Sequence, residues 1–327
     1  MSCIIYLGRR SIPVIYLWLL LVGQVAIAEQ IMLVTPPRDI ALKEPESPPP
    51  PGGPFTYATT GDKPNWYIQA WNIPAGKLSA FVERKERSNT VFSSSAPEAG
   101  VQIVKLPDGR TSYRLSQDGT VLPCSHQGEP LESNLLAGPN ALHARPPEWS
   151  SMTLRRDDML PIAQLVHLVA SATVAIRFAP TVLRKGCAVS QAAALISVVL
   201  NNRTAHQTLF YQVALSFGCG PQPEARQRLC ETLTNHPRAS YYFRTNPFGV
   251  ADVLPLFGQN WLPNDERHTL HLDLLPHLLR LIESGPSAMD HDSSHWTVDG
   301  YYNGQHIWGD VTMTSEWDDV GLIATTR

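Results

Sequence analysis

The sequence predicts an all-β protein, a β-sandwich of jelly-roll or lectin-like type with one short helix near residues 273–284. Three observations predict this fold. Apolar and polar residues alternate through many short segments, which is the period of a half-buried strand. Turn-forming Gly, Pro, Asn and Asp separate these segments, as in sandwiches and barrels. The chain also holds 28 prolines and only 17% charged residues, which favours a loop-rich β protein over a helical one.

The first 28 residues have the three parts of a secretory signal peptide. Arg9 and Arg10 are followed by an apolar run over 12–22, and Ala28 ends an Ala-Ile-Ala cleavage pattern. The run is shorter than the roughly 20 residues that a membrane-spanning helix needs. We therefore expect residues 1–28 to be removed, the mature chain to have no membrane span, and the protein to be secreted or periplasmic.

The mature chain is mildly acidic. Of 26 Lys and Arg, two lie in the signal, which leaves 24 against 29 Asp and Glu, a formal charge of −5. Without a basic stripe, nucleic acid is not an expected partner. Residues 29–64 are rich in proline, with four in a row from Pro48 to Pro51, so they are predicted to be a disordered tether. Residues 65–327 are predicted to form a single β-sandwich domain.

The first strands of this domain are predicted from period-two segments and turn signals. A strand over 66–73 stops at Pro74, and a hairpin pairs 101–105 with 111–115 around a Pro-Asp-Gly turn. A loop rich in Pro, Gly and Ser is expected from about 123 to 150.

The middle and the end of the domain carry the longest runs. Strands are expected over 165–178 and 238–244, and 191–200 pairs with 207–215 as a hairpin. The predicted helix near 273–284 rests on leucines and an isoleucine at three- and four-residue spacing. Short strands over 296–300, 301–308 and 310–317 end the chain, with Asn303-Gly304 as a turn. The sequence leaves open whether the strands close a barrel or stack as two sheets.

Four cysteines remain after the signal, an even number that in an oxidising compartment indicates two disulfides. Three pairings exist. Cys219 and Cys230 flank a Gly-Pro-Gln-Pro loop and are natural partners, which leaves Cys124 with Cys187. The alternative is free thiols, and no Cys-x-x-Cys pair supports zinc.

Aromatic and amide side chains on the middle and late strands point to carbohydrate recognition. Aromatic faces cover the apolar side of a sugar ring, while amides bond its hydroxyls without a charge to desolvate. We predict non-catalytic binding of a polysaccharide on a concave sheet face, with no cofactor. The predicted ligand contacts are Tyr211, Gln212, Tyr242, Arg244, His306 and Trp308. The competing interpretation is that these aromatics belong to the core.

Two other functions remain open. The first is a polysaccharide-cleaving enzyme, either a hydrolase with two nearby carboxyls or a lyase with Tyr or His beside an Arg. Its candidate acids are Glu132, Asp252, Asp299 and Glu316. The second is a surface or assembly protein that binds a protein partner. Clusters around His291 and His295, and around His268 and His271, lack a recognised ligand spacing, so no metal site is predicted.

Overall fold

The computed structural model describes residues 28–43, 56–71, 78–121, 132–140, 160–180, 190–216, 234–236, 239–245, 262–309 and 311–327. The predicted signal peptide and all four mature cysteines therefore lie outside the described residues, apart from Ala28.

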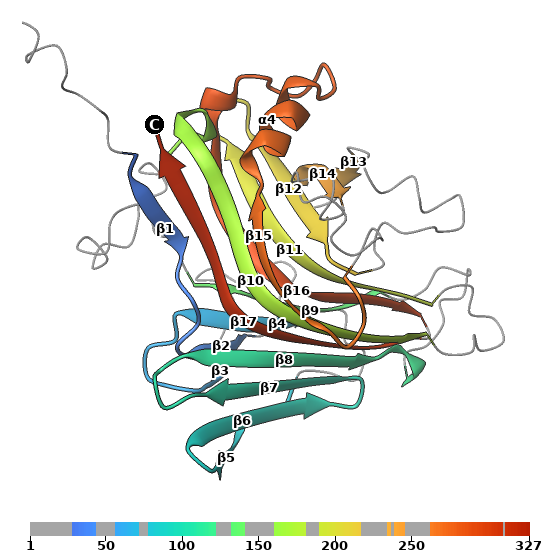
Figure 1. Ribbon diagram of the computed structural model, residues 1–327. Coiled ribbons are helices and arrows are strands. Elements are labelled where there is room, and N and C mark those ends of the chain that lie inside the picture. The colour runs from blue at the N-terminus through green and yellow to red at the C-terminus, as the bar shows by residue number, and fades with distance from the viewer. Residues whose placement is uncertain are drawn as a thin grey trace, which may run out of the picture.

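Two large sheets form a β-sandwich, as predicted (Figure 1). Sheet A has the spatial order β15 (Arg267–Asp273), β10 (Leu165–Pro180), β17 (Val311–Thr326), β8 (Thr111–Asp118), β7 (Ala99–Lys105), β6 (Asn89–Ala96) and β5 (Val82–Glu86), with β1 (Gln30–Val34) also paired to β17. Sheet B has the order β13 (Thr234–His236), β14 (Ala239–Thr245), β12 (Gln207–Ala214), β11 (Ser190–Asn202), β16 (Trp296–Gly309), β9 (Glu132–Pro139), β4 (Trp66–Trp71), β2 (Ile40–Lys43) and β3 (Thr56–Thr59).

Both predicted hairpins are present. Strands β7 and β8 pair antiparallel from Ala99 with Gln117 to Lys105 with Thr111. Strands β11 and β12 pair antiparallel from Leu195 with Ala214 to Asn202 with Gln207. Strand β12 is also paired in parallel with β14, and strand β2 in parallel with β4. Parallel pairs need longer connections than a tight turn, so local patterns predict the hairpins but not these neighbours.

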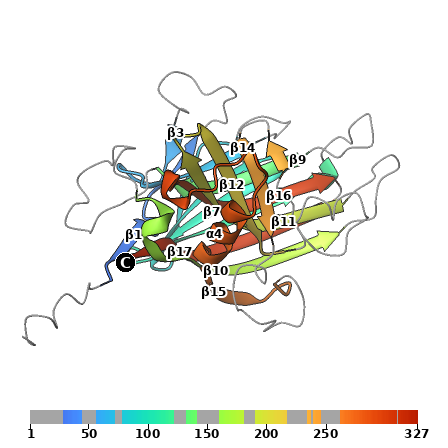
Figure 2. The same ribbon diagram turned by 90° about the horizontal axis from the view of Figure 1, so that it is seen from above.

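The predicted helix is α4 (Leu275–Glu283), the only α-helix in the ranges given above. It buries Leu275, Leu278 and Ile282 on one side, as the three- and four-residue spacing requires. The backbone N–H of Leu274 donates to the carbonyl of Leu168 on β10, at 2.8 Å. Seen from above, α4 lies between β10 of sheet A and β12 of sheet B (Figure 2). No helix in this part of the chain is long and apolar enough to cross a membrane.

The described residues also include three short 3-10 segments: η1 (Gly119–Val121), η4 (Ile162–Gln164) and η5 (Ser293–His295).

Aromatic residues fill the space between the sheets. The ring of Trp66 on β4 lies 6.3 Å from that of Tyr113 on β8 and 6.2 Å from that of Tyr301 on β16. Trp296 and Trp317 are also fully buried, so two of the three late tryptophans belong to the core. The indole N–H of Trp317 donates to Ser315 Oγ at 2.8 Å, which satisfies the one polar atom of its ring.

Polar side chains also bridge the two sheets within this core. Asn303 Nδ2 on β16 donates to the hydroxyl oxygen of Tyr113 at 2.5 Å, and Ser315 Oγ on β17 donates to Gln305 Oε1 at 2.7 Å. All four side chains are buried. A buried polar group is costly unless it is bonded, so these pairs favour one alignment of sheet A on sheet B.

The structure corrects three sequence-based expectations. The segment predicted as a tether contributes β1, β2 and β3, because Ile31, Leu33, Val34 and the stretch Ile40–Leu42 are buried beside later strands. The loop expected over 123–150 contains β9, which lies inside sheet B between β16 and β4. Asn303 and Gly304 lie within the 14-residue strand β16 and do not form a turn.

Candidate functional site

The outer face of sheet B, defined as the face turned away from sheet A, gathers several predicted contact residues. Trp66 packs against Tyr113 of sheet A, and Tyr301 packs against Trp66, so both face the interior. Because successive side chains of a strand point to opposite faces, Tyr67 and Tyr302 face outward.

Strand register places a row of polar residues on this outer face. Arg244 on β14 pairs with Gln212 on β12, and Gln212 pairs with Ser197 on β11. Ser197 pairs in turn with Tyr302 on β16. Paired residues on neighbouring strands point to the same side of a sheet, so all four share the outer face.

Gln212 is at the centre of a hydrogen-bonded group, the Gln212 cluster, made of Gln212, Tyr242, Arg244 and Tyr302. Its Nε2 donates to the hydroxyl oxygen of Tyr302 at 2.8 Å. Its Oε1 accepts from the hydroxyl of Tyr242 at 2.6 Å, and from Nε and Nη2 of Arg244 at 3.1 and 2.9 Å. Gln212 and Arg244 are buried, whereas both tyrosines are half-buried. The amide therefore fixes the guanidinium and two phenols relative to one another.

The guanidinium of Arg244 also lies near the ring of Tyr242, with its central carbon 5.5 Å from the ring centre. A cation at this distance from a phenol ring is attracted by the ring's electron density. The cluster thus combines two partly accessible aromatic rings, two hydroxyls, one amide and one positive charge.

A second group on the same face was missed by the sequence analysis. Lys43 Nζ lies 4.5 Å from the ring centre of Tyr67 and donates to Asn140 Oδ1 at 2.6 Å. Tyr67 pairs with Gly138, where an added Cβ would lie 3.3 Å from the Tyr67 hydroxyl oxygen. Burial, with a smaller contribution from Tyr302, raises the pKa of Tyr67. Tyr67 and Tyr302 therefore lie near each other over a position that has no side chain.

The signal for this second group was present but weak. Tyr67 belongs to a predicted strand in which it alternates with Trp66, so its outward direction was predictable. Lys43 falls in the segment expected to be a tether, and only its pairing with Gln69 of β4 places it on the outer face.

His306 shares this face but lies farther along β16. It is 6% exposed and pairs with Ala193 and Asn134. It is four residue steps along the strand from Tyr302, which is roughly 13 Å for an extended chain. Trp308 pairs with Gln191 and Glu132, but its side chain is outside the description.

Tyr211 is a correction to the predicted contact set. It is fully buried on the opposite side of β12 from Gln212, facing sheet A and α4. Its hydroxyl shares a 2.7 Å hydrogen bond with His277 Nδ1, and its ring stacks on Phe243 at 5.8 Å. Burial and the nearby Arg280 lower the pKa of His277, which favours a neutral ring there. Tyr211 therefore attaches α4 to sheet B and does not contact the outer face.

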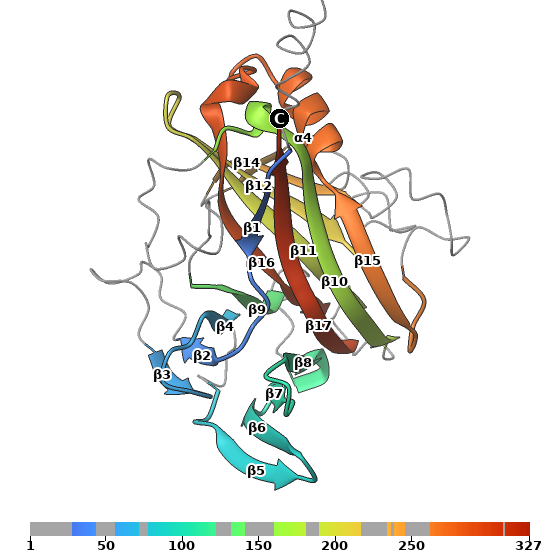
Figure 3. The ribbon, with the colours of Figure 1, turned by 60° about the vertical axis from the view of Figure 1, so that its left-hand side comes forward.

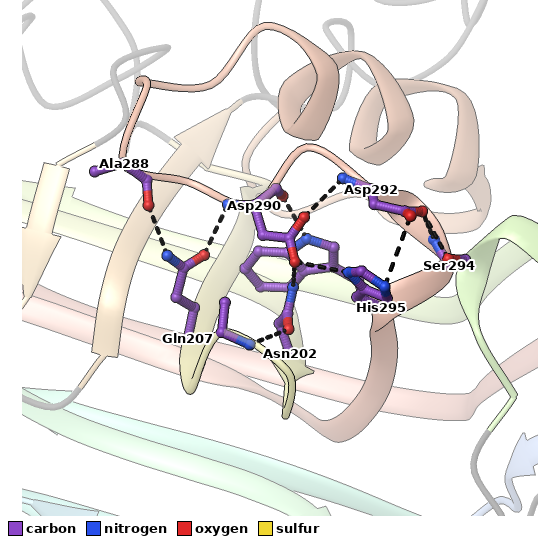
Figure 4. A network of polar contacts seen from close by, with 9 residues as sticks. Asn202, Gln207, Ala288, Asp290, Asp292, Ser294 and His295 are labelled. Atoms are coloured by element: carbon purple, nitrogen blue, oxygen red, sulfur yellow. Dashed lines mark hydrogen bonds and ion pairs between the residues drawn. The ribbon is translucent and has the colours of Figure 1, made fainter.

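The cluster around His291 and His295 is an internally bonded loop (Figure 4). Asp290 Oδ2 accepts from Asn202 Nδ2 at 2.9 Å and lies 2.8 Å from His295 Nδ1, while its Oδ1 accepts from the backbone N–H of Asp292 at 2.9 Å. The backbone N–H of Asp292, then Asn202, then His295 lower the pKa of Asp290 to about 2. The hydrogen bond that His295 makes with the Asp290 carboxylate raises the pKa of His295. These bonds form a polar clamp, made of Asn202, Asp290 and His295, that joins this loop to the end of β11.

The two candidate acids whose side chains are described, Asp299 and Glu316, lie on different sheets. Glu316 lies on sheet A, 3.8 Å from Arg114 and 3.9 Å from Arg267. Asp299 lies in β16 at the register shift next to the Val199 pairing. Asp252 is outside the described residues, as is the side chain of Glu132.

Comparisons with known proteins give only distant likenesses. No protein-family model matches the chain, and no curated protein sequence matches it. Among solved structures, the family 11 xylanase from Neocallimastix patriciarum is 8% identical, covers 76% of this chain and 93% of its own, and has a TM-score of 0.32. Endoglucanase 3 of family GH12 from Trichoderma harzianum is 9% identical, covers 79% and 97%, and has a TM-score of 0.33. Likenesses this weak carry no argument about function.

Proposed function

We propose that this protein binds a polysaccharide on the outer face of sheet B, outside the cytoplasm. One observation carries the proposal, the hydrogen-bonded cluster that joins Gln212, Tyr242, Arg244 and Tyr302 from three strands. His306, on the same face, and Trp308 remain predicted contacts farther along β16.

The cluster suits a sugar because it offers both kinds of contact that a pyranose needs. The half-buried rings of Tyr242 and Tyr302 present apolar surface with a polar tip. Their hydroxyls are already oriented by Gln212, so binding orders few additional side chains. A preorganised face of this kind favours rigid, hydroxyl-rich rings.

Titration of soluble polysaccharides by calorimetry, after a glycan-array screen, tests the proposal. Tyr302→Phe removes one oriented hydroxyl and should weaken binding roughly three- to tenfold, the worth of one hydrogen bond. Tyr211→Phe is the matched control, because it removes a hydroxyl from the opposite side of β12 and should leave affinity unchanged. No binding to any glycan, with capture of a protein partner in its place, would favour the assembly function.

Cleavage is a second candidate function, favoured by the position of phenols beside a guanidinium. In β-elimination a base removes the proton next to the sugar carboxylate, the neighbouring C–O bond breaks, and a double bond forms while the leaving oxygen takes a proton. Tyr302 and Tyr242 are candidates to carry the proton, and Arg244 to stabilise the carboxylate. Hydrolysis would instead need two carboxyls about 5–9.5 Å apart.

Product chemistry separates these outcomes. Elimination yields an unsaturated sugar that absorbs ultraviolet light, whereas hydrolysis yields new reducing ends without that absorbance. If Tyr302→Phe abolishes the absorbance signal but retains most of the affinity, catalysis is supported. Binding without either product leaves the protein as a binding module only.

A further inference from the structure

The strongest further feature of the molecule is the charge pattern of the outer face of sheet B. Arg244 and Lys43 lie near opposite ends of the row that crosses β14, β12, β11, β16, β9, β4 and β2. Six strand spacings separate β14 from β2, which is roughly 29 Å along the sheet. Between the two cations lie the phenols of Tyr302 and Tyr67.

The described side chains that face outward in this regular register include no carboxylate. Asp299 is the nearest acid in the sheet, and it lies at the β16 register shift, three residues before Tyr302. The whole chain, by contrast, has 29 acidic against 26 basic residues. The described side chains of this row therefore carry two cations and no anion, unlike the chain as a whole.

The exposed side of sheet A shows the opposite arrangement. There Arg267 is paired with Asp318 and lies 3.9 Å from Glu316, which is also 3.8 Å from Arg114. Arg177 is paired with Asp265. These basic groups of sheet A are paired with acids of the same sheet or of the turn before β15, whereas Lys43 contacts an amide oxygen and an aromatic ring.

We propose that the outer face of sheet B recognises an acidic polysaccharide, with sugar carboxylates held by Arg244 and Lys43 and sugar rings held against Tyr302 and Tyr67. The inference rests on the proposed binding function and names its ligand class. Guanidinium binds a carboxylate in a fixed plane, and Gln212 sets that plane here. Burial lowers the pKa of Lys43. A carboxylate bound beside its ammonium group would raise that pKa again, because an opposite charge favours the charged form.

Two small residues of the row, both buried, lie between its larger side chains. Gly138 lies between Tyr67 on β4 and Tyr302 on β16, and Ser197 lies between Tyr302 and Gln212. Ser197 is fully buried, and its Oγ has no hydrogen-bond partner within the described part of the chain. The bond between Gln212 Nε2 and the Tyr302 hydroxyl spans the strand that carries Ser197, so a ligand on this face meets the half-buried phenols and not Ser197.

The experiment compares polygalacturonate with the same polymer after reduction of its carboxyl groups. Calorimetric titration should show tighter binding to polygalacturonate than to the reduced polymer. High salt should weaken the binding of polygalacturonate and leave the binding of the reduced polymer unchanged. Lys43→Gln removes the charge but keeps an amide, and should weaken polygalacturonate binding roughly five- to tenfold without affecting the reduced polymer. Lys85→Gln, on the exposed edge strand β5, is the matched control and should change neither.

The outcomes distinguish the two proposals. Equal binding of both polymers would overturn the acidic-ligand inference and keep the polysaccharide function. Binding to neither would overturn both. Dextran sulfate is the third polymer of the experiment. Tighter binding to dextran sulfate than to polygalacturonate would show attraction to charge alone and would overturn carboxylate recognition. Since Arg244→Gln also disturbs the Gln212 cluster, Lys43→Gln is the deciding variant.

Discussion

The side chain of Gln212 makes four hydrogen bonds on the outer face of sheet B. Its oxygen accepts three hydrogen bonds and its nitrogen donates one, so the positions of two phenols and one guanidinium all depend on a single amide. The structural role of this residue is therefore separable from any contact it makes with a ligand.

Replacement of Gln212 by Met tests that structural role. Met is similar in size but offers Arg244 and Tyr242 no comparable acceptor, so Gln212→Met should lower the free energy of unfolding by about 2–3 kcal/mol. Gln102→Met on β7 is the matched control, and a change within about 0.5 kcal/mol is expected there. Urea denaturation measures both. Equal effects of the two variants would mean that the amide of Gln212 is dispensable.

The clamp of Asp290 and His295 predicts a pH dependence of stability. The pKa of Asp290 is lowered from 3.8 to about 2, so its stabilisation is present above pH 3.8 and is lost as the pH falls toward 2. The pKa of His295 is raised from 6.5, so its stabilisation is present below pH 6.5 and is lost as the pH rises through the folded value. The clamp is strongest between these limits.

Thermal melting of the wild type and of His295→Gln over pH 2–9 checks this expectation. The difference in Tm should be largest near pH 5 and should shrink toward both ends of the range. His291→Gln is the control, since His291 bonds only to the carbonyl of Pro286, at 3.2 Å, among the contacts described for it. A difference in Tm that does not vary with pH would rule out the ion pair as its cause.

Among the elements, β16 shows what a local pattern does and does not reveal. Alternation along the strand puts Tyr301 and Tyr302 on opposite faces, and the structure buries Tyr301 and leaves Tyr302 half-buried. The pair Asn303-Gly304, however, is typical of a hairpin turn, and here it continues the strand. The reason is tertiary, because Gly304 has φ of 148° and its Cα lies against the backbone of Leu135 on β9. A glycine inside a strand often marks such a close approach.

Replacement of Gly304 by Ala tests the close contact between β16 and β9. A Cβ at this position would lie 2.1 Å from the carbonyl oxygen of Leu135, so β9 or β16 must shift, and we expect a loss of roughly 3 kcal/mol or more in unfolding free energy. Gly109→Ala is the control for backbone strain alone. Gly109 also has a positive φ, 83°, but nothing lies within 4 Å of its Cβ position, so about 1 kcal/mol is expected. Similar losses at both positions would exclude the contact with β9.

At the scale of the whole molecule, sequence patterns predicted the class of fold and most strands after residue 65. They did not predict how distant strands become neighbours. Strands β2 and β9 come from segments dominated by proline and glycine, and both are held by neighbours supplied from elsewhere in the chain. For the same reason the site was predictable only in part. Gln212, Tyr242 and Arg244 lie on recognisable strands, whereas the place of Lys43 depends on the β2–β4 pairing.

The two ends of the chain provide the last prediction. Strand β1 lies along β17 near the C-terminus, with Gln30 opposite Thr325 and Val34 opposite Leu322 (Figure 3). Strand β8 pairs with β17 farther back, from Thr312 to Trp317, so β1 extends sheet A beyond the end of β8. Leu33 is 4% exposed and Met32 is 42% exposed, which gives two neighbouring positions with opposite environments.

Leu33→Ala should destabilise the protein by about 2–5 kcal/mol, the usual cost of removing a buried leucine side chain. Met32→Ala should cost less than about 1 kcal/mol, because a large part of that side chain already contacts water. Urea denaturation followed by tryptophan fluorescence measures both, since Trp317 is buried on the strand that β1 pairs with. If the segment acted only as a tether, neither variant would change stability, so a loss confined to Leu33→Ala would establish that residues 30–34 are part of the folded core.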